Sequence, residues 1–303
     1  MRRIICIISI CFLWKMIHSQ DMIDSIFLGI INPTWDDSSK LVKIYDWTGS
    51  NIQYSRSGYS RTDNSTWQSA TTVLQTGKAV CIGYANVIEA LCQKSGLQAF
   101  VVEGFSNDSY QTQHAWNIIR LNGNWYPLDV TWDAERIKAG LPWEYFLTGP
   151  EVFNQSHYPH DPAWQLTDNP LTFNDFKGNI KVTTFPLPFS YRDTLTQWLG
   201  LNDQERLIQS LQRSMLFNPE NAYVLKDLAN YYFEKAMTAY HLIAPVQVTD
   251  DSAGLLNDRL TQTRTFFRLA KGLFEKVIIL ENTAGMTDSK INLMMIEDNL
   301  KSL

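Results

Sequence analysis

The sequence predicts an α+β protein, with a helix and a β-hairpin followed by an α-helical C-terminal domain. Three observations predict this architecture. Apolar residues recur at helical spacing after Cys81, two β-rich runs flank Asn122 and Gly123, and helical stripes dominate from residue 191 onward. At 303 residues the chain is long enough for one or two domains.

The predicted helix begins at Cys81. Its apolar stripe consists of Cys81, Tyr84, Ala85, Ile88, Leu91 and Cys92, a spacing typical of one helical face. Cys81 is therefore expected in the first turn, where the helix dipole favours a thiolate and the backbone N–H groups are candidates for an oxyanion hole. Cys92 lies on the same stripe and is predicted to be a buried core residue.

Two runs rich in β-branched and aromatic residues, 114–121 and 124–130, flank Asn122-Gly123. This pattern is typical of a hairpin with a type I′ turn. The register of such a turn puts His114 opposite Thr131. His114 and Asp129 are then diagonal neighbours on one face, about 7–8 Å apart at the backbone.

Cys81, His114 and Asp129 would supply a nucleophile, its base and an orienting acid. The carboxylate can accept the imidazole N–H and leave the other ring nitrogen for the thiol. Asp133 is a rival for the third position, but it lies beyond the predicted strand pairing, so Asp129 is preferred. The side chains that precede the nucleophile and suit an oxyanion donor are Trp47, Tyr54 and Trp67, and the sequence does not choose among them.

Residues 1–19 have the features of a secretory signal peptide, with a basic start and an apolar core from Ile4 to Trp14. The core is too short to span a membrane, and no later apolar run reaches that length. We therefore expect a secreted or periplasmic protein whose mature chain keeps Cys81 and Cys92. A helix would separate these cysteines by about 16 Å, which is too far for a disulfide.

The composition favours an ordinary folded enzyme. The chain is 45% hydrophobic and carries a net charge of −5 without long charge runs, which argues against nucleic acid as a partner. No cofactor is expected, because neither a phosphate-binding glycine loop nor a calcium loop is apparent. His157, His160 and Asp161 are weak metal-ligand candidates, but the neighbouring prolines break any helix that would align them, so no metal site is predicted.

Five segments in chain order match a known pattern: IYDWTGSNIQY (44–54), VCIGYAN (80–86), HAWNIIRLNGNWYPLDVTWD (114–133), YFLTGPEVF (145–153) and HYPHDPAWQL (157–166). Together they resemble the transglutaminase-like core of the papain-like cysteine peptidase superfamily, especially its bacterial secreted and kyphoscoliosis-peptidase-like members. The resemblance implies a papain/transglutaminase-like core with a nucleophile helix packed on an antiparallel sheet. It also implies Cys81 as nucleophile, His114 as base and Asp129 as orienting acid.

The triad and the resemblance predict a cysteine peptidase, amidase or acyltransferase that acts on peptide or amide bonds through a thioester on Cys81. Hydrolysis is favoured over amine transfer, because the sequence shows no calcium loop and water is always available outside the cell. The expected substrate is a peptide or protein, cell-wall peptide included. The alternative is a catalytically silent module that keeps the fold and binds a protein partner.

The predicted order is a signal peptide at 1–19, a catalytic domain at 20–170, a connector at 171–190 that is irregular or contains a strand, and an α-helical domain at 191–303. One helical stripe consists of Leu225, Leu228, Ala229, Tyr232, Phe233, Ala236 and Tyr240, and another of Leu269, Leu273, Phe274, Val277 and Ile278. Residues 218–236 resemble the start of a tetratricopeptide-type helix. The helical domain is expected either to cap the catalytic core or to bind a protein partner, and neither role is favoured.

Overall fold

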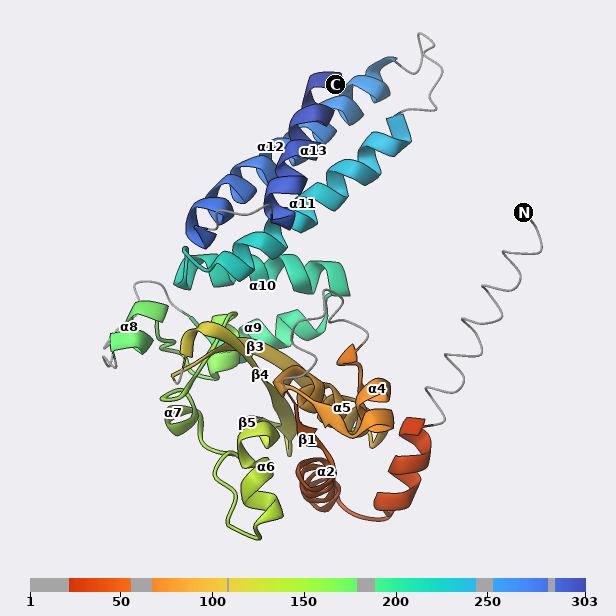
Figure 1. Cartoon of the computed structure of the whole chain (residues 1–303), viewed down its shortest axis with the longest axis vertical. Coiled ribbons are helices and arrows are strands. Elements are labelled where there is room, and N and C mark those ends of the chain that lie inside the picture. The colour runs from red at the N-terminus through yellow and green to blue at the C-terminus, as the bar shows by residue number, and fades with distance from the viewer. Residues whose placement is uncertain (1–21, 56–66, 108, 179–188, 244–252, 283–286) are drawn as a thin grey trace, which may run out of the picture. The chain divides into compact units, whose positions relative to one another are not determined.

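The computed structural model describes residues 22–55, 67–107, 109–178, 189–243, 253–282 and 287–303. The predicted signal peptide lies outside these residues. The described residues divide into two compact units: those within 1–159, 163–171 and 175–192 form the first, and those within 160–162, 172–174 and 193–303 form the second. The first unit combines helices with a sheet and the second is helical (Figure 1). The predicted α+β class with a helical C-terminal region is confirmed.

The first unit is built around a four-stranded antiparallel sheet in the order β5-β4-β3-β6. Its strands are β3 (Gln98–Ser106), β4 (Ser109–Leu121), β5 (Asn124–Leu128) and β6 (His157–Pro159). β3, β4 and β5 are consecutive in the chain, whereas β6 joins the other edge of β3 from a later part of the sequence. The sheet therefore brings residues near 157 close to residues near 105.

The hairpin between β4 and β5 has the predicted two-residue turn. Asn122 and Gly123 both have positive φ, 50° and 82°, as a type I′ turn requires. Leu121 faces Asn124, so the predicted register is confirmed.

The predicted end of this hairpin is wrong. Strand pairing stops at Leu128, and Thr131 lies in helix α6 (Val130–Lys138) instead of opposite His114. The side chain of Asp129 accepts hydrogen bonds from two backbone N–H groups of the first helical turn. This N-cap starts a helix in a segment whose β-branched residues favour a strand.

Helix α5 (Cys81–Lys94) packs on the sheet through β3 and β4. It begins at Cys81, as predicted. The other members of the predicted stripe, Tyr84, Ala85, Ile88, Leu91 and Cys92, are all buried. Cys81 and Cys92 are both free thiols, and Cys92 is a core residue, as expected.

Two helix–strand pairs lead the chain to α5. Helix α2 (Asp37–Asn51) precedes β1 (Gln53–Tyr54), and helix α4 (Ala70–Thr76) precedes β2 (Lys78–Ala79). β1 and β2 pair in parallel. Helix α4 ends at Gly77, whose φ of 65° favours glycine. A single residue, Val80, separates β2 from α5, so the helix begins beside this small sheet.

After α6 the chain forms α7 (Pro150–Phe153), β6, the 3₁₀ helix η1 (Pro162–Gln165) and α8 (Phe173–Gly178). Helix α8 lies within the predicted connector at 171–190. The connector is therefore helical at this point instead of irregular or extended. Residues 179–188 lie outside the described part of the chain.

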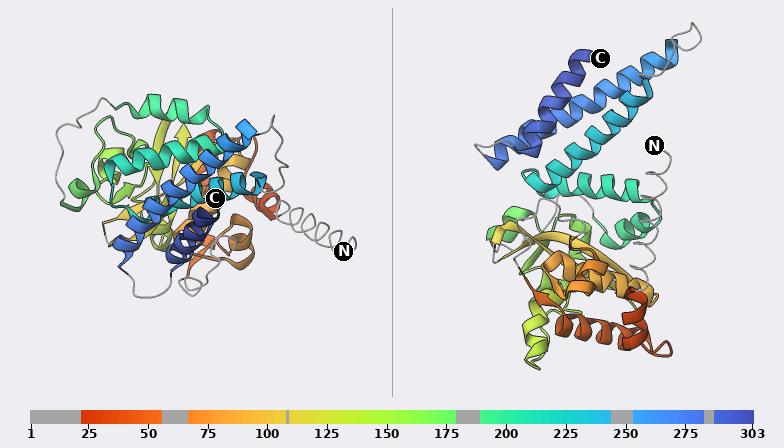
Figure 2. Two further views of the ribbon diagram at one scale, coloured as in Figure 1. Left: turned by 90° about the horizontal axis from the view of Figure 1, so that it is seen from above. Right: turned by 45° about the vertical axis from the view of Figure 1, so that its right-hand side comes forward.

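The second unit contains α9 (Tyr191–Leu199), α10 (Asp203–Phe217), α11 (Ala222–Ile243), α12 (Ala253–Glu281) and α13 (Asp288–Ser302). α12 packs against both α11 and α13 (Figure 2). In α11 the predicted stripe is confirmed, since Leu225, Leu228, Ala229 and Ala236 are buried. No helix among the described residues combines the length and apolar character of a membrane span.

The predicted stripe of α12 is wrong at one position. Leu269 is 43% exposed. The buried face of the helix is instead formed by Phe267, Ala270, Phe274 and Val277, which follow one another at three- and four-residue steps. Leu269 falls outside this stripe, so its apolar character does not indicate a core position.

Candidate active site

Cys81 is the first residue of α5, and its side chain is partly exposed. Val80 before it is extended and provides no side-chain cap for the helix. The first hydrogen bonds of the helix run from the N–H groups of Gly83 and Tyr84 to Val80 O. Because earlier N–H groups in a helix have no intrahelical acceptor, the positive end of α5 lies at the thiol.

The turn before Cys81 is held by Gln68. Its Oε1 accepts a hydrogen bond from Val80 N (3.0 Å), and its backbone oxygen accepts one from Asn86 Nδ2 (2.9 Å). Gly83 leaves room for this side chain, because a Cβ at that position would overlap Gln68 Oε1. The position of the thiol is thus set by a residue well before it in the sequence.

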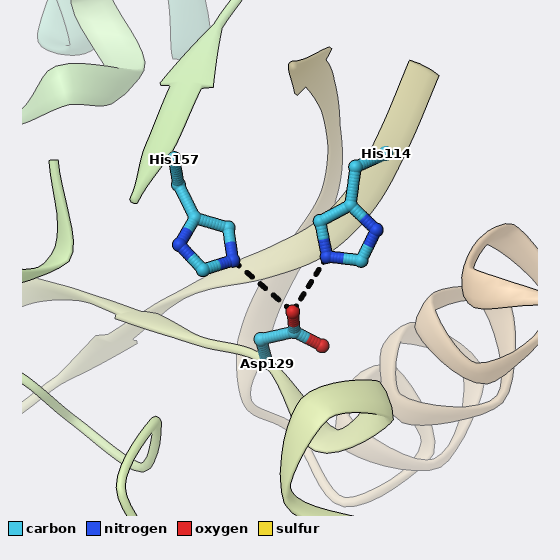
Figure 3. Close-up of side chains that lie close together, drawn as sticks. All are labelled: His114, Asp129 and His157. Carbon is cyan, nitrogen blue, oxygen red and sulfur yellow. Dashed lines mark hydrogen bonds and ion pairs between the residues drawn. The ribbon is translucent and has the colours of Figure 1, made fainter. Parts of the chain in front are cut away.

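His114 joins the thiol and the carboxylate. On β4, its Nε2 lies 2.6 Å from Asp129 Oδ2 (Figure 3), and Cys81 is close enough to the imidazole to raise its pKa. Since Nε2 faces Asp129, Nδ1 remains for the thiol. The structure therefore joins His114 to Asp129 by a hydrogen bond, with Cys81 as an electrostatic neighbour of the imidazole.

His114 and Asp129, which are both buried, stabilise each other's charges. Burial by itself lowers the pKa of His114, but the charge of Asp129, its hydrogen bond and the contact with Cys81 outweigh burial and raise the pKa to about 10. Burial opposes the charged form of Asp129 as well, yet the histidines beside it hold its pKa well below the usual range. At neutral pH the site therefore contains an imidazolium and a carboxylate.

Asp129 is fixed from several sides. Its Oδ1 accepts hydrogen bonds from Thr131 N (2.8 Å) and Trp132 N (3.2 Å), which leaves Oδ2 for His114. Its backbone N–H donates to Tyr145 O at 2.9 Å, and its backbone oxygen lies 2.9 Å from the hydroxyl oxygen of Tyr45. One carboxylate thus caps α6 and orients the imidazole.

Asp133, the rival carboxylate, faces other partners. It is fully buried in α6. Its Oδ2 accepts from Tyr45 Oη (2.7 Å) and Tyr145 N (2.9 Å), and its Oδ1 accepts from Glu144 N (2.9 Å). These contacts tie α6 to α2 and to the loop before α7, which is a structural role.

Sequence reasoning missed His157 as a neighbour of the triad. Its Nε2 lies 3.1 Å from Asp129 Oδ2, the oxygen that also contacts His114 (Figure 3). His160 and Asp161, the other two metal-ligand candidates from the sequence, belong to the second unit and contact Asn221 and Arg213 within it. No periodicity marks His157, because its place depends on the pairing of β6 with β3.

His114, Asp129 and His157 each offer one possible metal-ligand atom, and these three atoms lie within 4.8 Å of one another. The Nε2 atoms of His114 and His157 lie 2.6 and 3.1 Å from the same Asp129 oxygen, Oδ2, and these distances are hydrogen-bond lengths. Ligand atoms around a tetrahedral metal at about 2.0–2.1 Å would stand about 3.3 Å apart. The two histidines therefore lie at hydrogen-bonding distance from Asp129, closer to it than two ligands of one tetrahedral metal would be.

Aromatic rings enclose the two imidazoles. The ring of Trp132 stacks on His114 with centroids 5.3 Å apart, and Phe153 stacks on His157 at 4.0 Å. Trp116 lies 5.0 Å from His157 and is itself buried. This apolar surrounding lowers the local dielectric constant and strengthens the hydrogen bonds to Asp129.

Known proteins are similar to part of this chain. Residues 26–130 match the model of the transglutaminase-like superfamily. The chain is 29% identical to the kyphoscoliosis peptidase of Homo sapiens over 182 residues, which is 55% of this chain and 27% of the human protein. It is 28% identical over 120 residues to Lim and transglutaminase domain protein ltd-1 of Caenorhabditis elegans, covering 31% of this chain and 17% of that protein.

The matched part thus spans about a quarter or less of these relatives. Among solved structures, a TGase superposes with a TM-score of 0.34 and 19% identity, covering 38% of this chain and 32% of the other. The family match includes Cys81, His114 and Asp129. It ends before His157.

Proposed function

The chain contains a transglutaminase-like domain of the papain-like superfamily, and on this premise we propose that it is a cysteine enzyme that cleaves peptide or amide bonds. Cys81 is the nucleophile, His114 the acid–base group and Asp129 the orienting acid. The observation that carries the proposal is that one buried imidazole is hydrogen-bonded to the carboxylate and has the thiol as its electrostatic neighbour. A thiol, an imidazole and an acid in this order of contact are the parts that covalent acyl transfer needs.

In the first half of the reaction the Cys81 thiolate attacks the carbonyl carbon of the substrate. His114, protonated at neutral pH because its pKa is raised to about 10, donates a proton to the leaving nitrogen. The C–N bond breaks, the amine departs and the acyl group remains on Cys81 as a thioester.

In the second half, neutral His114 removes a proton from water as the water oxygen attacks the thioester carbon. The C–S bond breaks, the acid product leaves, and the thiolate and imidazolium are restored. Asp129 stays ionised throughout and stabilises the imidazolium. An amine in place of water would give transfer. We favour hydrolysis because the sequence contains no recognisable calcium loop.

The negative oxygen of the tetrahedral intermediate needs donors near Cys81. The first-turn N–H groups of α5 suit this role, because Val80 provides no side-chain cap that would occupy them. Of the aromatic candidates from the sequence, Trp47 packs against the core and Tyr54 is 40% exposed at the end of β1. Backbone donors are therefore preferred.

The substrate and its location form part of the same proposal. A peptide or protein amide, including a cell-wall peptide, fits a thiol nucleophile. The apolar segment at residues 1–19 supports export of the protein. A partner protein for the helical region also remains a proposal.

Alkylation by iodoacetamide near pH 7 tests the nucleophile. We expect Cys81 to react at least about tenfold faster than N-acetylcysteine, because its sulfur stands at the N-terminus of α5 beside the imidazole of His114. His114→Ala should reduce the rate to that of the model thiol, and Cys81→Ser should remove the labelled peptide. Buried Cys92 is an internal control that should stay unlabelled in the folded protein.

A second measurement separates an enzyme from a silent binding module. Reaction with p-nitrophenyl acetate should give an acetyl thioester on Cys81 that turns over, detected by mass spectrometry and nitrophenol release. Labelling of Cys81 no faster than the model thiol, together with no acetyl adduct, would favour the binding module.

A further inference from the structure

His157 reaches the site from a separate part of the fold. It lies on β6, opposite Ser106 of β3, and it is fully buried. Gly104 on β3 allows this close approach, because a Cβ there would overlap the backbone oxygen of Tyr158. Phe153 stacks on the His157 ring at 4.0 Å and 20°, so the ring orientation is fixed.

Both nitrogens of this ring have polar partners. Nε2 lies 3.1 Å from Asp129 Oδ2, and Nδ1 lies 2.8 Å from the hydroxyl of Ser156. The same hydroxyl lies 3.2 Å from Phe153 O. It can therefore donate either to the imidazole or to this carbonyl, but not to both at once.

The protons on these groups can be assigned. Asp129 is ionised, since its pKa is held well below the usual range, so it only accepts and His157 Nε2 must carry a proton. Burial lowers the pKa of His157, which leaves the ring neutral near pH 7. Its Nδ1 then carries no proton and accepts from Ser156. The tautomer is determined by its two neighbours.

We propose that His157 is a positioning residue of this site. It donates from Nε2 to the Asp129 oxygen that His114 also contacts, and Ser156 holds it in the tautomer that can do so. Two donors from different strands then fix the plane of one carboxylate, and the carboxylate fixes His114. This inference rests on the proposed function of Cys81, but the arrangement of protons can be measured without activity.

The same arrangement responds to acid. The titratable groups that face His157 are His114 on β4, Asp129 at the start of α6 and Tyr145 in the loop before α7. A second proton on His157 binds at Nδ1, and Ser156 must turn to Phe153 O. Two imidazolium rings then share one carboxylate oxygen, which weakens the hold of Asp129 on His114.

Histidine-selective ¹⁵N NMR of the Cys81→Ser protein tests the proton positions directly. At pH 7 we expect the ¹⁵N shifts of His157 to report a neutral ring protonated at Nε2, and those of His114 to report an imidazolium. Ser156→Ala should add the Nδ1-protonated form of His157. If His157 were protonated at Nδ1 alone while Ser156 is intact, the proposal would be overturned whether or not the protein is an enzyme.

Substitutions test the effect on the thiol. His157→Phe keeps a ring against Phe153 and removes the donor, and we expect the rate of Cys81 alkylation to fall about tenfold or more. His157→Gln restores a donor of similar reach and should recover part of that loss. Below pH 6.5 the wild-type rate should show an additional ionisation that His157→Gln lacks, because glutamine does not titrate.

His160→Gln is the matched control, since it changes a histidine three residues further along the chain whose partner is Asn221. It should leave the rate and its pH profile unchanged. Melting temperatures and circular dichroism establish that each variant is folded. Equal alkylation rates for folded His157→Phe and wild type, in a protein whose rate depends on His114, would overturn the positioning role while leaving the proposed function intact. A rate independent of His114 would overturn the proposed function first.

Discussion

The two ends of α5 carry the same side chain in different chemical surroundings. Cys81 stands at the N-terminal residue, is partly exposed and contacts His114. Cys92 lies near the other end and is completely buried. Burial, with a smaller contribution from the charge of Glu89, raises the pKa of the Cys92 thiol far above its ordinary value.

Both cysteines belong to one apolar stripe, so periodicity alone treats them alike. Position along the helix separates them. The N-terminus provides unpaired N–H groups and the positive end of the dipole, whereas the middle and the far end of a buried face provide only apolar contacts. A thiol becomes reactive where charge is stabilised and access is open.

Removing the charge of Asp129 should bring Cys81 closest to the behaviour of an ordinary thiol. Asp129→Asn keeps an oxygen that can cap α6 but no longer stabilises the His114 imidazolium. We expect turnover of p-nitrophenyl acetate to fall by about 10³–10⁴-fold, as in triads whose orienting acid is neutralised.

Asp133→Asn is the matched control for this change. It alters the same functional group in the same helix, but its partners are Tyr45 and the backbone of the 144–145 loop. It should keep turnover per folded molecule and lose about 1–3 kcal/mol of stability, measured by urea unfolding. If Asp133→Asn instead abolished turnover and Asp129→Asn did not, the acid assigned to the triad would be wrong.

The pH dependence of stability gives a moderate effect. The folded-state pKa of His114 is raised to about 10 from 6.5, so its contribution is fully present below pH 6.5 and is lost as the pH rises through 10. The free energy of unfolding of wild type should therefore fall relative to His114→Ala over this window, by at most about 1.4 kcal/mol per pH unit. A constant difference between the two proteins from pH 6.5 to 10 would contradict the charged state of His114.

Replacing the other cysteine should have the smallest effect on activity. Cys92→Ala removes a buried sulfur and should lower stability by about 1–2 kcal/mol through the cavity it leaves. Labelling of Cys81 and turnover should stay the same. In wild type, Cys92 should react with iodoacetamide only at denaturant concentrations that unfold the protein. Rapid labelling of native Cys92 would show that the two ends of α5 are less different than their burial indicates.

The elements predicted well from the sequence depend on neighbours in the chain. Asn122 and Gly123 specify the hairpin because few other residues adopt positive φ at both positions. The stripe from Cys81 to Cys92 specifies α5 because burial follows the helical repeat. The register of the hairpin was enough to bring His114 near Asp129.

The errors occur where a tertiary contact or a side-chain hydrogen bond overrides the local pattern. Val130 and Thr131 favour a strand by type, but the Asp129 side chain caps their N–H groups and starts α6. Leu269 is apolar yet exposed, because the packing of α12 selects a neighbouring stripe. In both cases the local preference is smaller than the interaction that replaces it.

By itself, the sequence of this protein determined the nucleophile helix, the hairpin and the pairing of an imidazole with an acid, because turn geometry and helical periodicity act over a few residues. Only the tertiary structure decided that His157, 28 residues beyond Asp129, shares its carboxylate oxygen. It also decided that Asp133 turns to Tyr45. These contacts follow from the pairing of β6 with β3 and the packing of α2 on α6, and no local pattern encodes which distant partners such packing brings together.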